Sequence, residues 1–482
     1  MQKILVLFLV LVITASFFTG CRKKTPVEKK ADYSGIELTY YKVFDDSDVI
    51  EPYIQAYIAD HPGLKINYKK FSDFEEYQKV ILNEMAEGEG PDIFAMPNTW
   101  FMSNYKKLAP LPSSLGTPEA FAATFVETAY KDLVRPDKEG VQQIYALPMT
   151  VDNLALYYNK EHFEDNIPTQ GKPSSTWEGI KEDVLQLTKQ DSGFDRFDVS
   201  GIALGRADNI SRAVDILYLL FLQYGVEFYD DQITEAIFAG KFGNTLSYPG
   251  MKALEFYASF ADETQKNYTW NEFTAEDDLA DQEIQAFAEG KVSMIVGYAY
   301  TYDLIVNYLG VLDSKGIETI DKSAIRIAPI PQLYDPKVSK EKRVTYASYF
   351  AETVSRNSEH AELAWDFLLF LTDKENLAQY FEDTHNPTSR RDLIEEQKKD
   401  PIYGVFATQV GFSESFPVLD YYLYKDIFSE VINRANIDGV NKSDLVYAQD
   451  LINEMIPKEG LLPDIIKNPE EEKKEEKDES KN

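Results

Sequence analysis

Cysteine is almost absent from this chain, because Cys21 is the only one among 482 residues. A disulfide within one chain needs two cysteines, so the fold depends on a large hydrophobic core instead. The four histidines are scattered, and none lies four residues from another. Transition-metal sites need His and Cys ligands at close spacing, so we expect no such site and no cofactor.

Motifs of several enzyme classes are missing as well. The sequence contains no G-x-x-x-x-G-K-[ST] loop for phosphate and no G-x-S-x-G nucleophile elbow. Paired carboxylates for glycoside hydrolysis stay open, because 81 acidic residues bring some carboxylates together by chance. We therefore expect no enzyme, and keep a secreted glycosidase or other hydrolase as an alternative.

Positive charge is also scarce, with 49 basic against 81 acidic residues and a net charge of -32. Nucleic acids and anionic lipid surfaces need a basic surface, so neither is an expected partner. The electrostatic field of this negative net charge repels an anionic small molecule, unless a local cluster of Arg or Lys reverses the field. A neutral solute is compatible with this charge.

The N-terminus carries the one long apolar run, from Ile4 to Phe18, after a short start that contains Lys3. The run is short for a spanning helix, which needs about 20 apolar residues. It reads as a signal peptide over residues 1–20, and Thr-Gly before Cys21 is similar to a bacterial lipobox, although Phe18 stands where Leu is usual. We expect an acyl chain such as palmitate on Cys21. An uncleaved anchor helix, or a plain signal with a stray cysteine, is the alternative.

Two further segments are expected to lie outside the folded body. Residues 21–33 are short, polar and charged, as in a tether between an anchor and a domain. Residues 468–482 contain no apolar side chain and should be disordered. No repeat of solenoid period is present.

Between them, strand and helix patterns alternate. Residues 36–43 alternate as a strand does, and Ser47 is expected to cap a helix that ends at His61. A strand at 64–68, a helix at 74–87 and a strand at 93–96 follow. Strands separated by single helices favour parallel crossovers, so the fold class is α/β. Ligands of such sheets bind at the carboxyl ends of the strands.

Seven motifs succeed one another between about residue 36 and residue 392. They are HPGLKI (61–66), GPDIF (90–94), LPMTVDNLALYYNK (147–160), Pro168 with TWEGI (176–180), FAEGKVSMIVGY (287–298), VSRNS with AWDFLLFL (354–358 and 364–371) and NPTSR (386–390). In this order they resemble the extracellular solute-binding proteins of ABC importers, the family that includes the maltose- and oligosaccharide-binding proteins.

The resemblance implies a two-lobed clamp of the periplasmic-binding-protein type, with three segments crossing between two α/β lobes. The crossings are expected near 150–152, 345–348 and 386–389. The first lobe would then comprise residues 34–150 and 347–387, and the second lobe residues 151–346 and 389–467. Hinges that close on a ligand are a known switching device.

A sugar needs planar polar groups beside its hydroxyls and aromatic rings on its C–H faces. The strand ends and crossings supply this mixture in ten candidate residues, namely Asp45, Asp46, Asn98, Trp100, Asp152, Asn153, Arg206, Tyr298, Tyr300 and Arg390.

Five of the candidates also have a structural alternative. Trp100 could be a core anchor, the two aspartates at 45–46 could form a solvated helix N-terminus, and Asp152 with Asn153 could hold backbone.

The sequence thus predicts a monomeric, lipid-anchored binding protein on the outer face of the cell membrane. It would capture a small solute, a sugar or oligosaccharide, and deliver it to an ABC permease in the cytoplasmic membrane. Besides the hydrolase, a ligand sensor or adhesin without transport is a second alternative to this transport role.

Replacement of Cys21 by Ser should abolish lipid labelling and release the protein from membranes, since the variant has no thiol to acylate. Labelling with a radioactive or alkyne fatty acid, followed by fractionation, measures both effects. Full membrane retention of the cleaved variant would contradict the lipid anchor.

Overall fold

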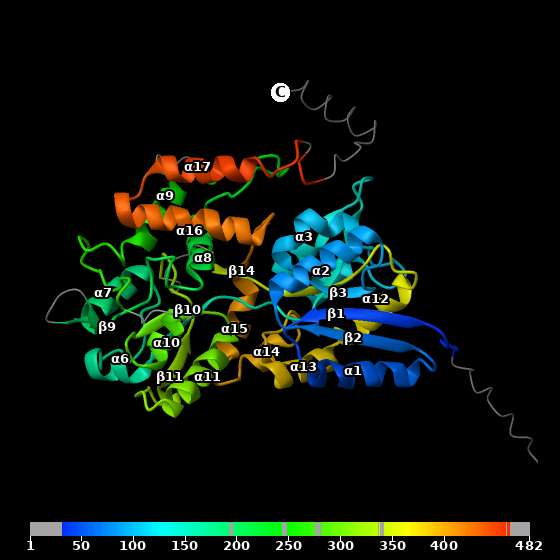
Figure 1. The fold of residues 1–482 in the computed structure, drawn as a ribbon, viewed down its shortest axis with the longest axis horizontal. Helices are drawn as coiled ribbons and strands as arrows, with labels where there is room; N and C mark the ends of the chain where they lie inside the picture. Colours follow the sequence, from blue (N-terminus) through cyan, green and yellow to red (C-terminus); the bar gives the residue numbers. More distant parts are fainter. Residues whose placement is uncertain are drawn as a thin grey trace, which may run out of the picture.

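The computed structural model describes residues 31–191, 196–242, 248–274, 281–335, 337, 342–458 and 460–462. The expected signal peptide, Cys21 with most of the tether, and the acidic tail at 468–482 lie outside the described residues. Figure 1 shows two halves side by side, each with strands and surrounding helices. Buried apolar residues form two separate core clusters, and we call the halves built on them the first and the second lobe.

The first lobe is built on a five-stranded sheet of order β2-β1-β3-β13-β6. Strands β1 (Glu37–Val43), β2 (Lys65–Phe71) and β3 (Ile93–Pro97) run parallel, as their single-helix connections require. Strand β13 (Phe350–Val354) enters from far along the sequence and pairs antiparallel with both β3 and β6 (Ala146–Pro148). The expected parallel α/β arrangement is confirmed for the first three strands.

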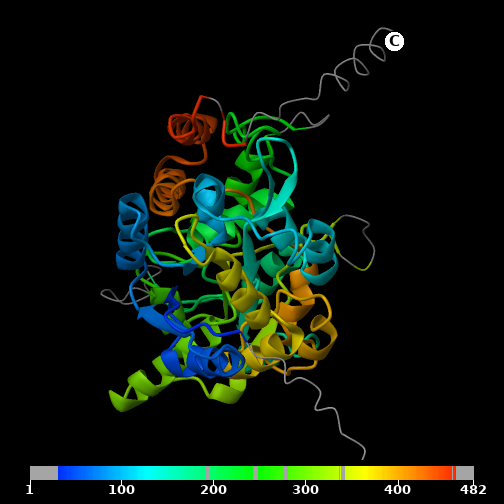
Figure 2. The same ribbon diagram turned by 90° about the vertical axis from the view of Figure 1, so that its right-hand side faces the viewer.

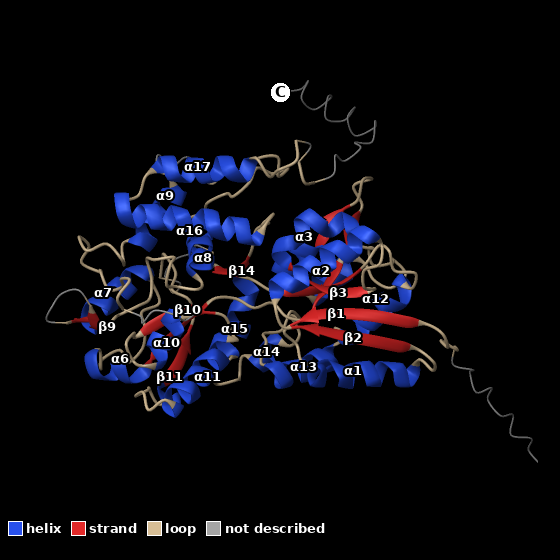
Figure 3. Ribbon diagram, viewed as in Figure 1, coloured by secondary structure: helices blue, strands red, loops and turns tan. Residues whose placement is uncertain are grey.

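Helices cover both faces of this sheet (Figure 3). Their bounds are α1 Ser47–Asp60, α2 Phe74–Glu87, α3 Asn98–Asn104, the 3-10 helix η1 Tyr105–Lys107, α4 Pro118–Thr124, α5 Glu127–Leu133, α12 Ala361–Leu371 and α13 Lys374–Thr384. A hairpin of β4 (Val134–Pro136) and β5 (Gln142–Ile144) completes the lobe. The predicted helix at 74–87 is confirmed at both ends. Ser47, in contrast, is the first helical residue, and Asp46 occupies the N-cap position without a side-chain cap bond.

The second lobe contains a three-stranded sheet in which β7 (Ala155–Asn159) lies between β10 (Met294–Gly297) and β11 (Ile325–Ala328). Both neighbours run antiparallel to β7, unlike the parallel strands of the first lobe. Its helices are α6 Lys160–Asn166, α7 Trp177–Leu187, α8 Ala213–Gln223, α9 Pro249–Ala258, α10 Gln282–Ala288, α11 Thr301–Ser314, η2 Lys322–Ala324, α15 Gly404–Gln409, α16 Tyr421–Asp438 and α17 Lys442–Asn453. The short helices α14 (Ile394–Gln397) and η3 (Val410–Phe412) pack against the first-lobe cluster through Ile394 and Val410. Two short pairs, β8 Lys189–Gln190 with β9 Phe197–Val199 and β12 Thr345–Tyr346 with β14 Ser413–Glu414, complete it.

Core membership changes along the chain where the two lobes are connected. Val151 belongs to the first-lobe cluster and Leu154 to the second, while Tyr346 and Ala347 divide in the opposite order. Isolated bridges pair residue 150 with 388 and residue 153 with 347, so these segments lie together. This arrangement supports the expected crossings, whose positions and lobe boundaries stay a prediction.

A buried ion cluster joins the end of β1 to β13 and to the turn after β1. The Lys42 Nζ atom lies 2.6 Å from Glu352 Oε1 and 3.0 Å from Asp45 Oδ2, and all three side chains are buried or nearly so. Tyr380 of α13 donates a hydrogen bond to Asp45. Desolvation lowers the pKa of Lys42, but Asp45 and Glu352 outweigh it, and the net pKa is raised. The lysine is therefore the cation that keeps two buried carboxylates compensated.

Replacement of Lys42 by Met should lower the free energy of unfolding by about 3–5 kcal/mol, because it leaves Glu352 buried without a counter-charge. The double variant Lys42→Met with Glu352→Gln should recover part of the loss. Denaturant titration followed by circular dichroism measures both. The matched control is Lys65→Met, which breaks an exposed pair with Glu37 and should change little. Equal effects of the two single variants would contradict the role of the cluster.

Candidate ligand-binding site at the junction of the two lobes

Aromatic rings from both lobes meet at the N-termini of α2 and α16. Phe74 of the first lobe stacks on Trp100, with ring centroids 5.0 Å apart. It also contacts Tyr421 and Tyr422 of the second lobe, with ring centroids 6.3 and 6.2 Å apart. We call these four residues the interlobe aromatic contact. It brings apolar ring faces of both lobes to one place.

A cationic group of the second lobe lies next to Tyr421 of this contact. The Arg212 guanidinium, at the start of α8, lies over the rings of Tyr298 and Tyr300 at 5.9 and 5.6 Å. The two tyrosine rings stack on each other with centroids 5.8 Å apart. Tyr300 is 37% exposed, whereas Tyr298 is only 2% exposed. We call these residues, together with Asp215, the arginine–tyrosine cluster.

Asp215 holds Tyr298 and Arg212 of the cluster through a hydrogen bond and an ion pair. Its Oδ2 atom accepts a hydrogen bond from Tyr298 at 3.2 Å and lies 3.8 Å from Arg212 Nη1. Burial raises the pKa of Asp215, and Arg212 and Tyr298 oppose that rise. Burial also raises the pKa of Tyr421, to about 12, so its hydroxyl stays protonated at neutral pH. The cluster therefore offers fixed donors beside aromatic faces.

Asp152 is buried and holds backbone at the second-lobe side of the junction. Its carboxylate accepts hydrogen bonds from the backbone N–H groups of Ala299, at 3.1 and 3.2 Å, and of Asn153, at 2.7 Å. Ala299 lies between the two stacked tyrosines, so Asp152 positions both of them. Burial raises the pKa of Asp152 to about 7, against the opposing effect of these hydrogen bonds.

Asp132 of α5 is a second buried carboxylate at the junction. Its oxygens accept hydrogen bonds from Tyr349 at 2.8 Å, from Ser415 at 2.7 Å and from Asn98 at 3.4 Å. Burial raises the pKa of Asp132. Ser415 follows β14 of the second lobe, so this group links the two lobes through polar contacts.

The ten predicted residues divide into two groups by position. Trp100, Tyr298, Tyr300, Asp152 and Asn98 lie at the junction, and their roles in ligand binding stay predictions. Trp100 is only 4% exposed, and its indole N–H has no hydrogen-bond partner in the described parts of the chain.

The other five have structural partners of their own. Asp45 belongs to the buried ion cluster, and Asp46 is exposed and paired with Lys70. Asn153 is fully buried and bonded to Phe406 and Gln409. Arg206 pairs with Asp208 and Glu272, and Arg390 pairs with Asp392. Their roles in ligand binding stay predictions that the junction does not support.

Sequence reasoning missed three residues at the junction, and all three lie at helix starts. Phe74 and Tyr421 are the first residues of α2 and α16, and Arg212 is the N-cap residue of α8. Asp73 and Asp420 cap the first two helices through their side chains. Aspartate is a common N-cap residue, so the starts of these two helices could be predicted from the sequence.

The β1–α1 turn contributes one further ring. Phe44 is exposed and has a φ of 73°, a value that non-glycine residues rarely adopt. Its backbone N–H donates to the carbonyl of Phe71, and its ring packs edge-on against Phe350 at 6.2 Å. Phe350 in turn contacts Phe74 at 5.8 Å, which extends the aromatic surface to this turn.

Other kinds of site lack support in the described residues. Within them, no three His, Cys, Asp or Glu side chains are grouped as metal ligands. No helix of the described segments is both long and apolar enough to span a bilayer.

The fold is that of the two-lobed sugar-binding proteins of ABC transporters. A solute-binding protein from Thermotoga lettingae TMO, bound with α-D-tagatose, aligns with 87% of this chain and 99% of its own at a TM-score of 0.63 and 18% identity. The sugar-binding protein MalE of Xanthomonas citri aligns with 87% of this chain and 97% of its own, at a TM-score of 0.66 and 14% identity. The cyclic α-maltosyl-1,6-maltose-binding protein of Arthrobacter globiformis aligns with 87% of this chain and 98% of its own, at a TM-score of 0.65 and 15% identity. At such identities the likeness establishes the fold.

The family follows from the sequence match. A family model described as bacterial extracellular solute-binding protein matches residues 45–378, more than half of the chain, and the chain belongs to this family. A protein of Brucella abortus (strain 2308) named as a binding protein is 23% identical over 330 residues, which cover 68% of this chain and 69% of that protein.

The raised pKa of Asp152 gives a pH signature. The folded pKa of about 7 exceeds the usual 3.8, so between about pH 4 and pH 7 the folded state holds a proton that the unfolded state has lost. The free energy of unfolding should therefore fall as pH rises through this window, by up to about 1.4 kcal/mol per pH unit.

Asp152→Asn removes this group and leaves the other buried carboxylates in place. The difference in unfolding free energy between the native chain and the variant should shrink from about pH 4 to pH 7 and level off above. Denaturant titrations across that range measure it. A difference that is constant with pH would contradict the assignment.

Proposed function

We propose that this protein captures a neutral carbohydrate between its lobes and delivers it to an ABC permease. The observation that carries the proposal is the arginine–tyrosine cluster next to the interlobe aromatic contact, in a chain of this family. An exposed tyrosine face offers stacking for a sugar ring, and a guanidinium offers several donors for its hydroxyl oxygens.

Local charge favours a neutral solute over an anionic one. Arg212 is accompanied by Asp215, and Asp152 adds a further carboxyl group close to Tyr300. The arginine therefore leaves no net positive charge for a phosphate or carboxylate. Structural neighbours bound with α-D-tagatose, maltotetraose and mannobiose support the carbohydrate class.

The mechanism is a clamp. Open and closed forms exchange, and a solute favours closure only by binding the closed form more tightly. Reversal of a 1:99 population to 99:1 needs a preference of about 5.5 kcal/mol. A micromolar ligand supplies about 8 kcal/mol in total, so closure is within its reach. The aromatic rings of both lobes are the groups that a bound solute would bridge.

The closed clamp would then dock on the permease at the outer face of the cytoplasmic membrane. A lipid on Cys21 would hold the clamp near this partner and raise its effective concentration. A single acyl chain binds membranes weakly, so stable anchoring needs more than one chain. Relatives named as binding proteins favour this role over hydrolysis.

A thermal-shift screen against mono- and oligosaccharides identifies the solute, because a ligand at 100 times its dissociation constant adds about 2.7 kcal/mol of stability. Tyr300→Ala should then weaken binding of that sugar by about 1–3 kcal/mol, the worth of burying an aromatic ring. Tyr300 is a sharper test than Trp100 or Tyr298, whose buried rings also support the core.

Isothermal titration measures the affinity, and small-angle scattering measures the compaction on sugar addition. The control is Tyr447→Ala, which removes an exposed ring from α17, away from the junction. Normal affinity and compaction in the Tyr300 variant would refute the site. No stabilisation by any sugar of the panel would refute the substrate class.

A further inference from the structure

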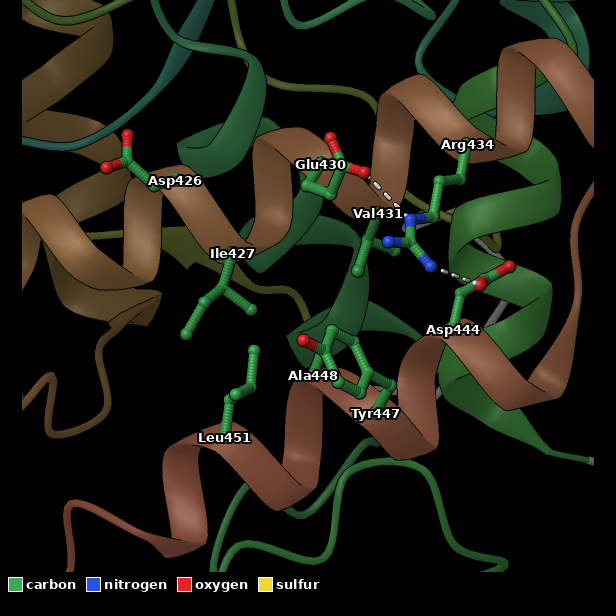
Figure 4. A pocket seen from close by; sticks show the side chains of 9 residues that line it. All are labelled: Asp426, Ile427, Glu430, Val431, Arg434, Asp444, Tyr447, Ala448 and Leu451. Carbon is green, nitrogen blue, oxygen red and sulfur yellow. Dashed lines mark hydrogen bonds and ion pairs between the residues drawn. The ribbon is translucent and has the colours of Figure 1, made fainter.

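A groove lies between α16 and α17 on the second lobe (Figure 4). Ile427 and Val431 of α16 and Ala448 and Leu451 of α17 form an apolar floor. Tyr447 lines one wall and is 53% exposed, a large exposure for an aromatic ring on a helix. The groove therefore combines buried aliphatic groups with an accessible ring.

The rim of the groove is acidic. Glu430 and Asp444 both pair with Arg434, at 2.8 and 3.5 Å, and the guanidinium lies over the Tyr447 ring at 5.6 Å. Asp426, one turn before Glu430, is a third carboxylate on the same rim. Three carboxylates against one arginine leave a net negative charge around an apolar floor. Such a rim is complementary to an apolar group with a cation beside it.

The volume of the groove favours a single protein side chain over a small-molecule ligand. The cavity has a volume of about 240 Å³, below the range of about 300–1,000 Å³ that is usual for small-molecule pockets. It is large enough for one bulky side chain. Pockets that receive a single anchor residue are typical of the energetic centres of protein interfaces.

Position connects the groove to the clamp. The same helix α16 that forms one wall carries Tyr421 and Tyr422 at its N-terminus, where they touch Phe74 of the first lobe. In Figures 1 and 2, α16 and α17 lie along the upper side of the molecule, and Figure 1 places α2 and α3 beside the end of α16. A partner seated on α16 therefore touches the helix whose relation to the first lobe changes when the clamp opens or closes.

We infer that the α16–α17 groove receives an apolar side chain with a neighbouring lysine or arginine from the outer surface of the membrane permease. This inference rests on the proposed function and adds the docking contact to it. The apolar side chain of the permease fills the cavity, and the neighbouring cation pairs with Asp426 and Glu430. Transfer of the solute to the permease depends on both contacts.

The test uses cells that lack the chain and are complemented with the full-length protein. Uptake of the radiolabelled sugar selected by the thermal-shift screen is measured for the native chain, Tyr447→Asp and Asp426→Lys. Both variants should lower the uptake rate by about tenfold or more, because one blocks the anchor and the other repels its cation. Melting temperature and sugar affinity of the purified variants should stay unchanged, since neither side chain lies at the junction.

The matched control is Tyr334→Asp, at a tyrosine of the same lobe that is 58% exposed and outside the groove. Its uptake should equal that of the native chain. Native uptake by the two groove variants would overturn the docking contact while leaving the proposed function intact. Failure of the native chain itself to restore uptake of a sugar that it binds would overturn both.

Discussion

The burial of apolar side chains in two separate cores is the constraint on which the rest of this structure depends. Each lobe buries most of its aliphatic and aromatic residues around its own sheet, while Phe381 of α13 joins the second-lobe cluster and Ile233 and Leu461 join the first-lobe cluster. Between the lobes lie ring contacts, hydrogen bonds and a few shared apolar side chains, such as Leu419, which packs against both clusters. A solute shifts the balance between two arrangements of the lobes only by its preference for one of them.

Buried carboxylates recur at the places where the lobes are held in register. Asp132 links α5 to the segment after β14, and Asp152 holds the turn that carries the stacked tyrosines. Burial raises the pKa of both groups, so each is retained at an energetic cost. Hydrogen bonds from backbone and hydroxyl groups compensate them. Such networks define one geometry, whereas an apolar contact would tolerate several.

Local signals in the sequence predicted the first lobe well. The α2 helix has the expected bounds because Asp73 caps its start and Gly88, in a left-handed conformation, ends it. Ser47 was assigned as a cap because serine is a common N-cap residue, whereas the preceding Asp46 holds that position. The antiparallel pairing of β7 with β10 and β11 was not predictable from the pattern of single strands, since the partners are far apart along the chain.

In the candidate site, too, local signals predicted some residues, whereas others depend on contacts between distant parts of the chain. Trp100, Tyr298 and Tyr300 follow strand ends and lie at the junction, and their contact with a ligand stays a prediction. Phe74, Arg212 and Tyr421 lie at helix starts, and which helix starts meet depends on how the two lobes pack. Arg206 and Arg390 have the expected chemistry, but nearby carboxylates satisfy them. Residue type and spacing do not reveal such pairing.

The turn at Phe44 has a consequence for the energy of any contact that is made at it. A non-glycine residue at a φ of 73° is held in place by the surrounding structure, here by the bond to Phe71 and by the ring of Phe350. The conformational entropy of this turn is therefore already lost in the empty protein. A solute that reaches the aromatic surface meets a rigid turn, and the energy of contact is not spent on ordering it.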